Sequence, residues 1–180
     1  MSAAPHAPQA RSRAAAASAV RRLFLLFRLG DDRYALAADA VVRVLPLQPL
    51  KQLPGAPEWV AGVLVHRDAP VPVIDLSRLA LGRPSRHLTS TRIVLVAHRH
   101  RGQGALRTLG LMLEGVTQTS HRNPADFVPC GLDSPQARYL GPVLNEPDGM
   151  LQWVDVDALL SDEARALLFP DVVAGEVGCS

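Results

Sequence analysis

Aromatic residues and cysteines are scarce in this sequence of 180 residues, and lysine is almost absent. Aromatic residues make up 4% of the chain, and its two cysteines, Cys130 and Cys179, share no paired spacing. This pattern supports neither a disulfide framework nor a zinc site, and it indicates a reducing compartment, the cytoplasm. Lys51 is the only lysine, so arginine carries almost all of the positive charge.

The sequence also lacks an apolar run of the ~20 residues that a membrane-spanning helix requires, so we expect no direct membrane insertion. Residues 1–20 are rich in Ala, Pro, Ser and Arg and contain no apolar signal-peptide core, which predicts a disordered tail. We expect a second flexible tail at residues 170–180. The foldable part, residues 21–169, is long enough for one domain or for two small subdomains that share a core.

The charge balance is close to neutral, with 19 Lys+Arg against 17 Asp+Glu and a net charge of +2. With 48% hydrophobic and 20% charged residues, the composition is that of an ordinary soluble globular protein. A nucleic-acid binder more often shows a concentrated basic surface interleaved with aromatic residues. The arginine-rich composition nevertheless leaves a small-barrel nucleic-acid-binding protein open as the alternative function.

Residues 59–82 are the most informative stretch. Two apolar runs rich in β-branched residues flank a polar tip at residues 67–70, which predicts a hairpin. Asp75 is then placed to cap a short helix that Gly82 ends. A guanidinium at the end of a stiff hairpin is an ordered donor, so Arg67 is the first candidate site residue. The alternative is an ordinary solvated turn residue.

Short strands and one-turn helices account for most of the remaining chain. Residues 37–40 predict one helical turn, residues 119–136 predict a loop, and Ser161 is placed to cap a final short helix. Further strands are predicted at residues 23–29, 34–36, 41–45, 92–97 and 108–113.

The two halves of the chain resemble each other. The matched segments are residues 36–43 with 111–118 and residues 62–76 with 141–156. This alignment pairs Gly62 with Gly141 and Asp75 with Asp155, and it requires one extra residue near the tip at residues 145–149. Both aspartates are expected to cap helical turns. We infer two equivalent β subdomains, each too small to bury its own surface and therefore packed against the other.

Candidate catalytic and metal-binding groups are weak. His98 and His100 have the spacing of one strand face, but Arg99 and Arg101 would repel a cation. The sequence Gly102-Gln103-Gly104 lacks the third glycine and the following helix of a phosphate-binding loop. No catalytic residue, metal or cofactor is therefore predicted, and an enzyme is disfavoured.

In combination, several motifs along residues 23–169 resemble the CheW-like domain family, the coupling proteins of chemotaxis. They are Phe27-Arg28-Leu29-Gly30-Asp31-Asp32-Arg33-Tyr34-Ala35-Leu36, Val41-Val42-Arg43-Val44-Leu45, Trp59-Val60-Ala61-Gly62-Val63, Val71-Pro72-Val73-Ile74-Asp75-Leu76, Gly110-Leu111-Met112-Leu113 and Val154-Asp155-Val156-Asp157-Ala158-Leu159-Leu160.

The resemblance implies a mainly β fold of two intertwined SH3-like five-stranded β-barrels around a shared hydrophobic core, with short helices. One barrel would lie mainly in residues 36–83 and the other mainly in residues 108–160, with terminal segments exchanged. The implied function is a non-enzymatic cytoplasmic scaffold without cofactors. It would couple the cytoplasmic tip of a methyl-accepting chemoreceptor to the regulatory domain of a CheA-type histidine kinase within receptor arrays, where self-association is left open.

In that family the receptor contact lies in the groove between the subdomains. The matching positions here, with the neighbouring turn residues, are Val41, Arg43, Gly62, His66, Arg67 and Asp68. Two features depart from the family pattern. The turn usually reads Asn-Leu-Arg-Gly where this chain has Val65-His66-Arg67-Asp68, and Arg43 stands where an acidic residue is common. The reversed charge indicates a divergent array or a dedicated system, such as one for surface sensing or twitching motility.

Overall fold

The computed structural model describes residues 21–99, 104–131 and 137–170, which form nine strands and two α-helices. The strands are β1 (Arg22–Leu29), β2 (Asp32–Ala37), β3 (Val41–Pro46), β4 (Val60–His66), β5 (Ala69–Asp75), β6 (Arg92–His98), β7 (Arg107–Arg122), β8 (Leu140–Glu146) and β9 (Gly149–Val154). The helices are α1 (Leu76–Leu81) and α2 (Asp162–Leu168), with single 3-10 turns at η1 (Ala38–Ala40) and η3 (Pro124–Asp126). The predicted mainly β class is confirmed.

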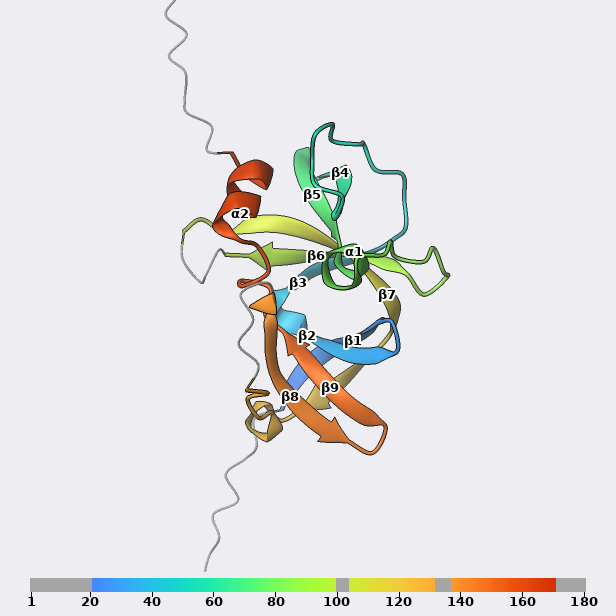
Figure 1. The fold of residues 1–180 in the computed structure, drawn as a ribbon, viewed down its shortest axis with the longest axis vertical. Coiled ribbons are helices and arrows are strands. Elements are labelled where there is room, and N and C mark those ends of the chain that lie inside the picture. The colour runs from blue at the N-terminus through green and yellow to red at the C-terminus, as the bar shows by residue number, and fades with distance from the viewer. Residues whose placement is uncertain (1–20, 100–103, 132–136, 171–180) are drawn as a thin grey trace, which may run out of the picture.

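The strands form two five-stranded units that share β7 (Figure 1). In the first unit, which we call the β4–β5 unit, the amino-terminal half of β7 pairs with β5 and β6, and β3 and β4 flank them. In the second, the β8–β9 unit, the carboxy-terminal half of β7 pairs with β1, followed by β2, β9 and β8. Two isolated bridges link connecting segments to these units: Lys51, after β3, pairs with Val63 of β4, and Val128, after β7, pairs with Val143 of β8.

The sequence repeat is realised through exchanged strands. Leu36, in the first copy of the repeat, pairs in parallel with Val154 of the second copy. Leu111, in the second copy, pairs in parallel with Ile74 of the first. Each repeat therefore contributes its opening strand to the unit built by the other, and neither unit is formed by one continuous half of the chain.

The repeat alignment was wrong around its glycines. Equivalent pairs in the two hairpins are Val60 with Ile74 and Leu140 with Val154, and Val63 and Val143 make the equivalent bridges. Each residue lies 80 positions after its counterpart, so no extra residue is needed at the tip. Gly62 is therefore equivalent to a proline, not to Gly141. Both hairpins carry a bulge at this point, and matching the glycines by identity displaced the alignment by one residue.

The main core lies between the two units. It joins fully buried side chains of six strands and α1, among them Leu29, Leu36, Ile74, Leu76 and Leu111. Each such leucine or isoleucine stabilises the fold by about 1.5–3 kcal/mol. Each unit also contains one smaller apolar cluster. The cluster of the β8–β9 unit includes Phe24, Phe127, Leu151 and Trp153, and that of the β4–β5 unit includes Leu64, Val73, Ile93 and Leu95.

The long strand β7 corrects a second expectation. Residues 119–122, predicted as part of a loop, continue β7 and pair with β1, for example Thr119 with Leu25. The segment is polar because its side chains are largely exposed, so it carries no apolar signal of a strand. The hydrogen bonds of an antiparallel partner hold it in the sheet. Asn123 then caps η3 through its side chain, which agrees with the predicted turn.

The helix caps agree with the sequence at two of three places. Asp75 accepts a hydrogen bond from the Arg78 amide (3.1 Å), and Gly82 ends α1 at a φ of 68°, as predicted. Ser161 caps α2 by accepting from the Ala164 amide (3.1 Å). The prediction for Asp155 was wrong, because its carboxylate accepts from the Asp157 amide (2.9 Å) in a turn that no helix follows.

Candidate functional site

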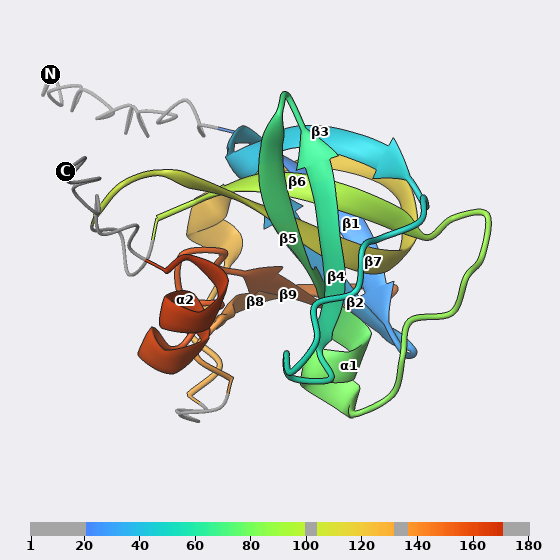
Figure 2. The same ribbon diagram turned by 90° about the horizontal axis from the view of Figure 1, so that it is seen from above.

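The predicted turn at the tip of the β4–β5 hairpin is formed by Arg67 and Asp68. Their φ angles are 51° and 63°, and His66 pairs with Ala69 on either side. Two left-handed residues in a two-residue loop match the twist of the hairpin, which asparagine and glycine adopt at the lowest cost. Arg67 and Asp68 are exposed, while His66 is half-buried and its Nε2 has no hydrogen-bond partner among the described residues. Figure 2 shows this hairpin extending away from α1.

Replacing Arg67 with glycine is expected to raise the free energy of unfolding by about 1 kcal/mol, because glycine adopts a positive φ without the steric cost of Cβ. Thermal or denaturant unfolding of the purified variant measures this change. Ala69→Gly, outside the turn, is the control and should lower stability. A destabilised Arg67→Gly variant would show that the arginine side chain supports the fold.

Gly62 lies in β4 beneath the segment that joins β3 to β4. It is buried, has a φ of 140°, and a Cβ at this position would lie 2.7 Å from the Lys51 carbonyl oxygen and 2.9 Å from Leu50 Cβ. Lys51 and Val63 exchange two backbone hydrogen bonds of 2.9 and 2.8 Å at the same place. Because Gly62 has no Cβ, this segment can lie directly on β4, where it covers Gly62.

Strand β3 carries the other two predicted residues. β3 pairs with β6 along one edge, and none of the other described strands pairs with its second edge. A bulge between Val41 and Arg43 alters the register. Val41 is half-buried against the main core, whereas the neighbouring side chains of Val42 and Val44 are exposed. Arg43 is exposed and its guanidinium has no hydrogen bond or ion pair with any described residue, so its charge is available to a partner.

Two cavities lie between the units. One, of about 710 Å³, is bounded by Trp59, Leu79 and Tyr139 on one side and by the segment leading into α2 on the other. The second, of about 630 Å³, has walls from η1 and the end of β9. None of the six predicted residues lines either cavity. The second cavity does reach Ala40, the residue before Val41, so it continues the surface of β3.

A model of the CheW-like domain family matches residues 23–164 of this chain. The chain belongs to the CheW-like domain family. Members of this family are non-enzymatic scaffolds of chemotaxis.

Individual relatives agree with this membership. The chain is 24% identical over 150 residues to the chemotaxis protein CheW of Bacillus subtilis (strain 168), covering 82% of this chain and 92% of that protein. It is 36% identical over 70 residues to protein FrzA of Myxococcus xanthus, covering 39% and 44%. The fold is similar to that of the scaffolding protein TtCheW from Thermoanaerobacter tengcongensis, with a TM-score of 0.66 and 20% identity, covering 78% and 88%.

Sequence reasoning missed Glu114, the most buried carboxylate among the described residues of this CheW-like domain. This side chain is 1% exposed at the midpoint of β7. Its carboxylate accepts hydrogen bonds from the Arg83 guanidinium (2.9 Å), the Arg86 amide (2.9 Å) and Arg86 Nε (3.1 Å). Ser77 Oγ donates a further bond of 3.2 Å. A lone glutamate inside the apolar sequence Gly110–Val116 was the available signal, but its partners come from a distant loop.

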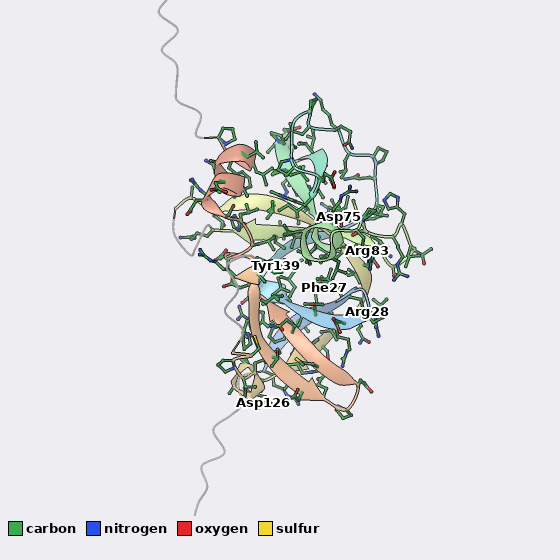
Figure 3. All side chains as sticks on the ribbon, in the orientation of Figure 1. Phe27, Arg28, Asp75, Arg83, Asp126 and Tyr139 are labelled. Carbon is green, nitrogen blue, oxygen red and sulfur yellow. The ribbon has the colours of Figure 1, made fainter. Side chains whose placement is uncertain are left out.

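The environment of Glu114 fixes its protonation state. Burial by itself would raise the pKa of this carboxyl, but the hydrogen bonds from Arg83 and Arg86 lower it to about 2. Asp75 completes the same cluster by accepting from the Ser85 amide (2.8 Å) and hydroxyl (2.6 Å). The two carboxylates anchor the segment that follows α1, on the side where Figure 3 labels Asp75 and Arg83.

The remaining candidates from the sequence have structural surroundings. His98 is 1% exposed, its Nδ1 lies 2.8 Å from the Val156 carbonyl oxygen, and its ring stacks on Phe169. His100 and Cys179 lie outside the described residues. In the described parts of the chain, no group of three or more His, Cys, Asp or Glu residues is placed to hold a metal ion. No helix of the described residues has the length and apolarity needed to cross a membrane.

Proposed function

We propose that this CheW-like domain couples the cytoplasmic tip of a methyl-accepting chemoreceptor to the regulatory domain of a CheA-type histidine kinase. The proposal rests on family membership and on one observation about the surface. Arg43 lies on strand β3 and Arg67 in the tight turn between β4 and β5; both are exposed and have no ion-pair partner among the described residues. Charges held in this way are available to pair with carboxylates of a partner.

The geometry favours recognition over chemistry. Arg67 occupies a strained turn position where a glycine would be more stable, and such strain is retained mainly where the side chain has a function. Val41 and the exposed Val42 and Val44 supply apolar contact area beside Arg43. Gly62 contributes indirectly by holding the covering segment in place. An apolar helical hairpin with acidic residues at its edge is the partner that fits this combination.

Arg43→Glu and Arg67→Glu are each expected to weaken binding to the signalling domain of the cognate chemoreceptor at least tenfold. Reversing an unpaired exposed charge leaves the fold intact but places like charges against the partner. Pull-down or titration with the purified receptor domain measures the change. Arg107→Glu, at an exposed position on β7, is the matched control. Unchanged binding in both variants would refute this receptor surface.

The partner system is proposed to be a divergent one. Arg43 replaces the acidic residue common in the family, and a segment of the chain is similar to FrzA as well as to CheW proteins. A receptor array for surface sensing or twitching motility would accommodate the reversed charge with acidic receptor residues. The protein would reside in the cytoplasm and join the membrane-bound array through its partners.

A further inference from the structure

The charges of this chain are segregated along the sequence. Residues 76–113 contain seven arginines and no aspartate or glutamate. Residues 40–57, which include β3 and the segment after it, also contain no acidic residue but have Arg43 and Lys51. Because the whole chain is nearly neutral, the acidic residues are concentrated elsewhere. This part keeps a net positive charge, although Arg78, Arg83 and Arg86 pair with glutamates outside the two segments.

The fold brings the two acid-free segments together. β3 and β6 come from different segments and are neighbours in the sheet, and β6 pairs in turn with the first half of β7. One side of the β4–β5 unit is therefore built from three adjacent strands without a carboxylate. Four acidic residues directly flank the two segments. Asp75 and Glu114 are buried, and Glu114 is bound by Arg83 and Arg86. Asp39 and Glu58 are exposed and pair with Arg22 and Arg78.

A groove of about 580 Å³ lies at one end of this sheet, between the end of β3 and the loop that precedes β6. Leu88 and Val44, with exposed fractions of 47% and 42%, are apolar side chains on its two sides. The groove lining includes Val44, Pro46, Leu47, Leu88, Thr89 and Arg92. It contains apolar surface and a cation, but no acidic or aromatic side chain.

The wall formed by residues 88–92 is fixed by hydrogen bonds. Arg92 Nη1 donates to the carbonyl oxygens of Thr91 (2.9 Å) and Thr89. Thr91 Oγ1 donates to the Arg86 carbonyl oxygen (2.5 Å) and accepts from the Leu88 amide (3.2 Å). The Ser90 carbonyl accepts from the Val116 amide (2.9 Å), which ties the loop to β7. The groove is thus preformed, and a ligand would not have to order it.

We propose that this groove binds a short acidic segment of a partner protein, with an apolar side chain of the segment inserted between Val44 and Leu88 and a carboxylate facing Arg92, the cation of the lining. The acid-free sheet attracts negative charge, and the apolar walls favour a side chain over a phosphate backbone. A nucleic acid would need aromatic side chains for base stacking, which the lining lacks. A membrane surface is flat and would not fill a recessed groove. The groove adjoins the proposed receptor surface, because Val44 belongs to both, whereas Leu88 and Arg92 belong to the groove alone.

Selection from a phage-displayed library of random twelve-residue peptides tests the proposal. We expect the selected peptides to carry an apolar residue flanked by two or more acidic residues. Their affinity should fall as salt rises. Leu88→Glu places a carboxylate in the groove and should weaken the best peptide at least tenfold. Leu167→Glu, on α2, is the matched control because Leu167 has a similar exposed fraction of 44%, and it should leave the affinity unchanged.

Four results would overturn the proposal. The first is that the selected peptides have no acidic bias, and the second is that the best peptide binds the Leu88→Glu protein and the unaltered protein with equal affinity. The third and fourth are Leu88-dependent binding to a single-stranded oligonucleotide, or to phosphatidylglycerol vesicles, that is tighter than binding to the best peptide. Receptor binding should remain normal in Leu88→Glu, so a failure of this proposal is distinguishable from a failure of the receptor assignment.

Discussion

Replacing Gly62 with alanine is expected to lower the free energy of unfolding by about 3 kcal/mol and to detach the segment after β3 from β4. Two costs combine. A φ of 140° is unfavourable for any residue with a Cβ, and that Cβ would lie 2.7 Å from a backbone oxygen that cannot move independently. The Lys51–Val63 hydrogen bonds, which hold the connecting segment on β4, would have to lengthen or break.

Gly55→Ala separates these two costs. Gly55 lies in the same connecting segment with a φ of 78°, but a Cβ there would meet no atom within 4 Å. It is expected to lose only about 1 kcal/mol, the cost of the left-handed conformation alone. Denaturant unfolding of both variants gives the comparison, and amide exchange at Lys51 and Val63 reports detachment. Equal losses in the two variants would show that the close contact at Gly62 relaxes without cost.

Replacing Glu114 with glutamine is expected to cost about 3 kcal/mol of stability at neutral pH, since the pKa of this carboxyl is about 2 against an ordinary value of 4.5. The charged carboxylate receives four hydrogen bonds, three of them from Arg83 and Arg86, and the amide cannot accept them all. Because the folded-state pKa lies below the unfolded one, this stabilisation is present above pH 4.5. It is lost as the pH falls toward 2.

The pH dependence gives this prediction its own readout. The unaltered protein should lose stability between about pH 5 and pH 2 more steeply than the Glu114→Gln protein, and the difference between them should vanish at the acidic end. Glu58→Gln is the control, because Glu58 also pairs with an arginine, Arg78, but its side chain is 83% exposed. That variant should match the unaltered protein. If the stability of the Glu114→Gln protein changed with pH in parallel with that of the unaltered protein, the ionised carboxylate of Glu114 would not be the source of the lost stability.

Local features of this fold could be predicted from the sequence because neighbouring residues determine them. The β4–β5 hairpin, the Asp75 cap and the Ser161 cap each depend on a few consecutive residues, and all three are confirmed. Asp155 shows the limit of the same reasoning. A helix needs more than its cap, and no helix begins at Asp155, since α2 starts only at Asp162.

Features set by distant partners could not be predicted in this way. The polar end of β7 is a strand only because β1 pairs with it. The register of the second hairpin depends on a bulge that forms at Gly62 in the first hairpin and at a proline in the second. The partners of Glu114 lie about thirty positions away in a loop, with no periodic signal to connect them. Among the candidate site residues, sequence placed Arg43 and Arg67 on the surface, but it did not show that Gly62 would be covered.

The sharing of β7 by both units has a mechanical consequence. β7 has 16 residues, of which one half is hydrogen-bonded to β5 and β6 and the other half to β1. The two units are therefore joined without a linker that could act as a hinge. A rotation that a bound protein imposes on one unit is therefore transmitted to the other unit through strand β7. The backbone hydrogen bonds of β7 would therefore transmit force between the two units, and Glu114 lies where β7 passes from the first unit to the second.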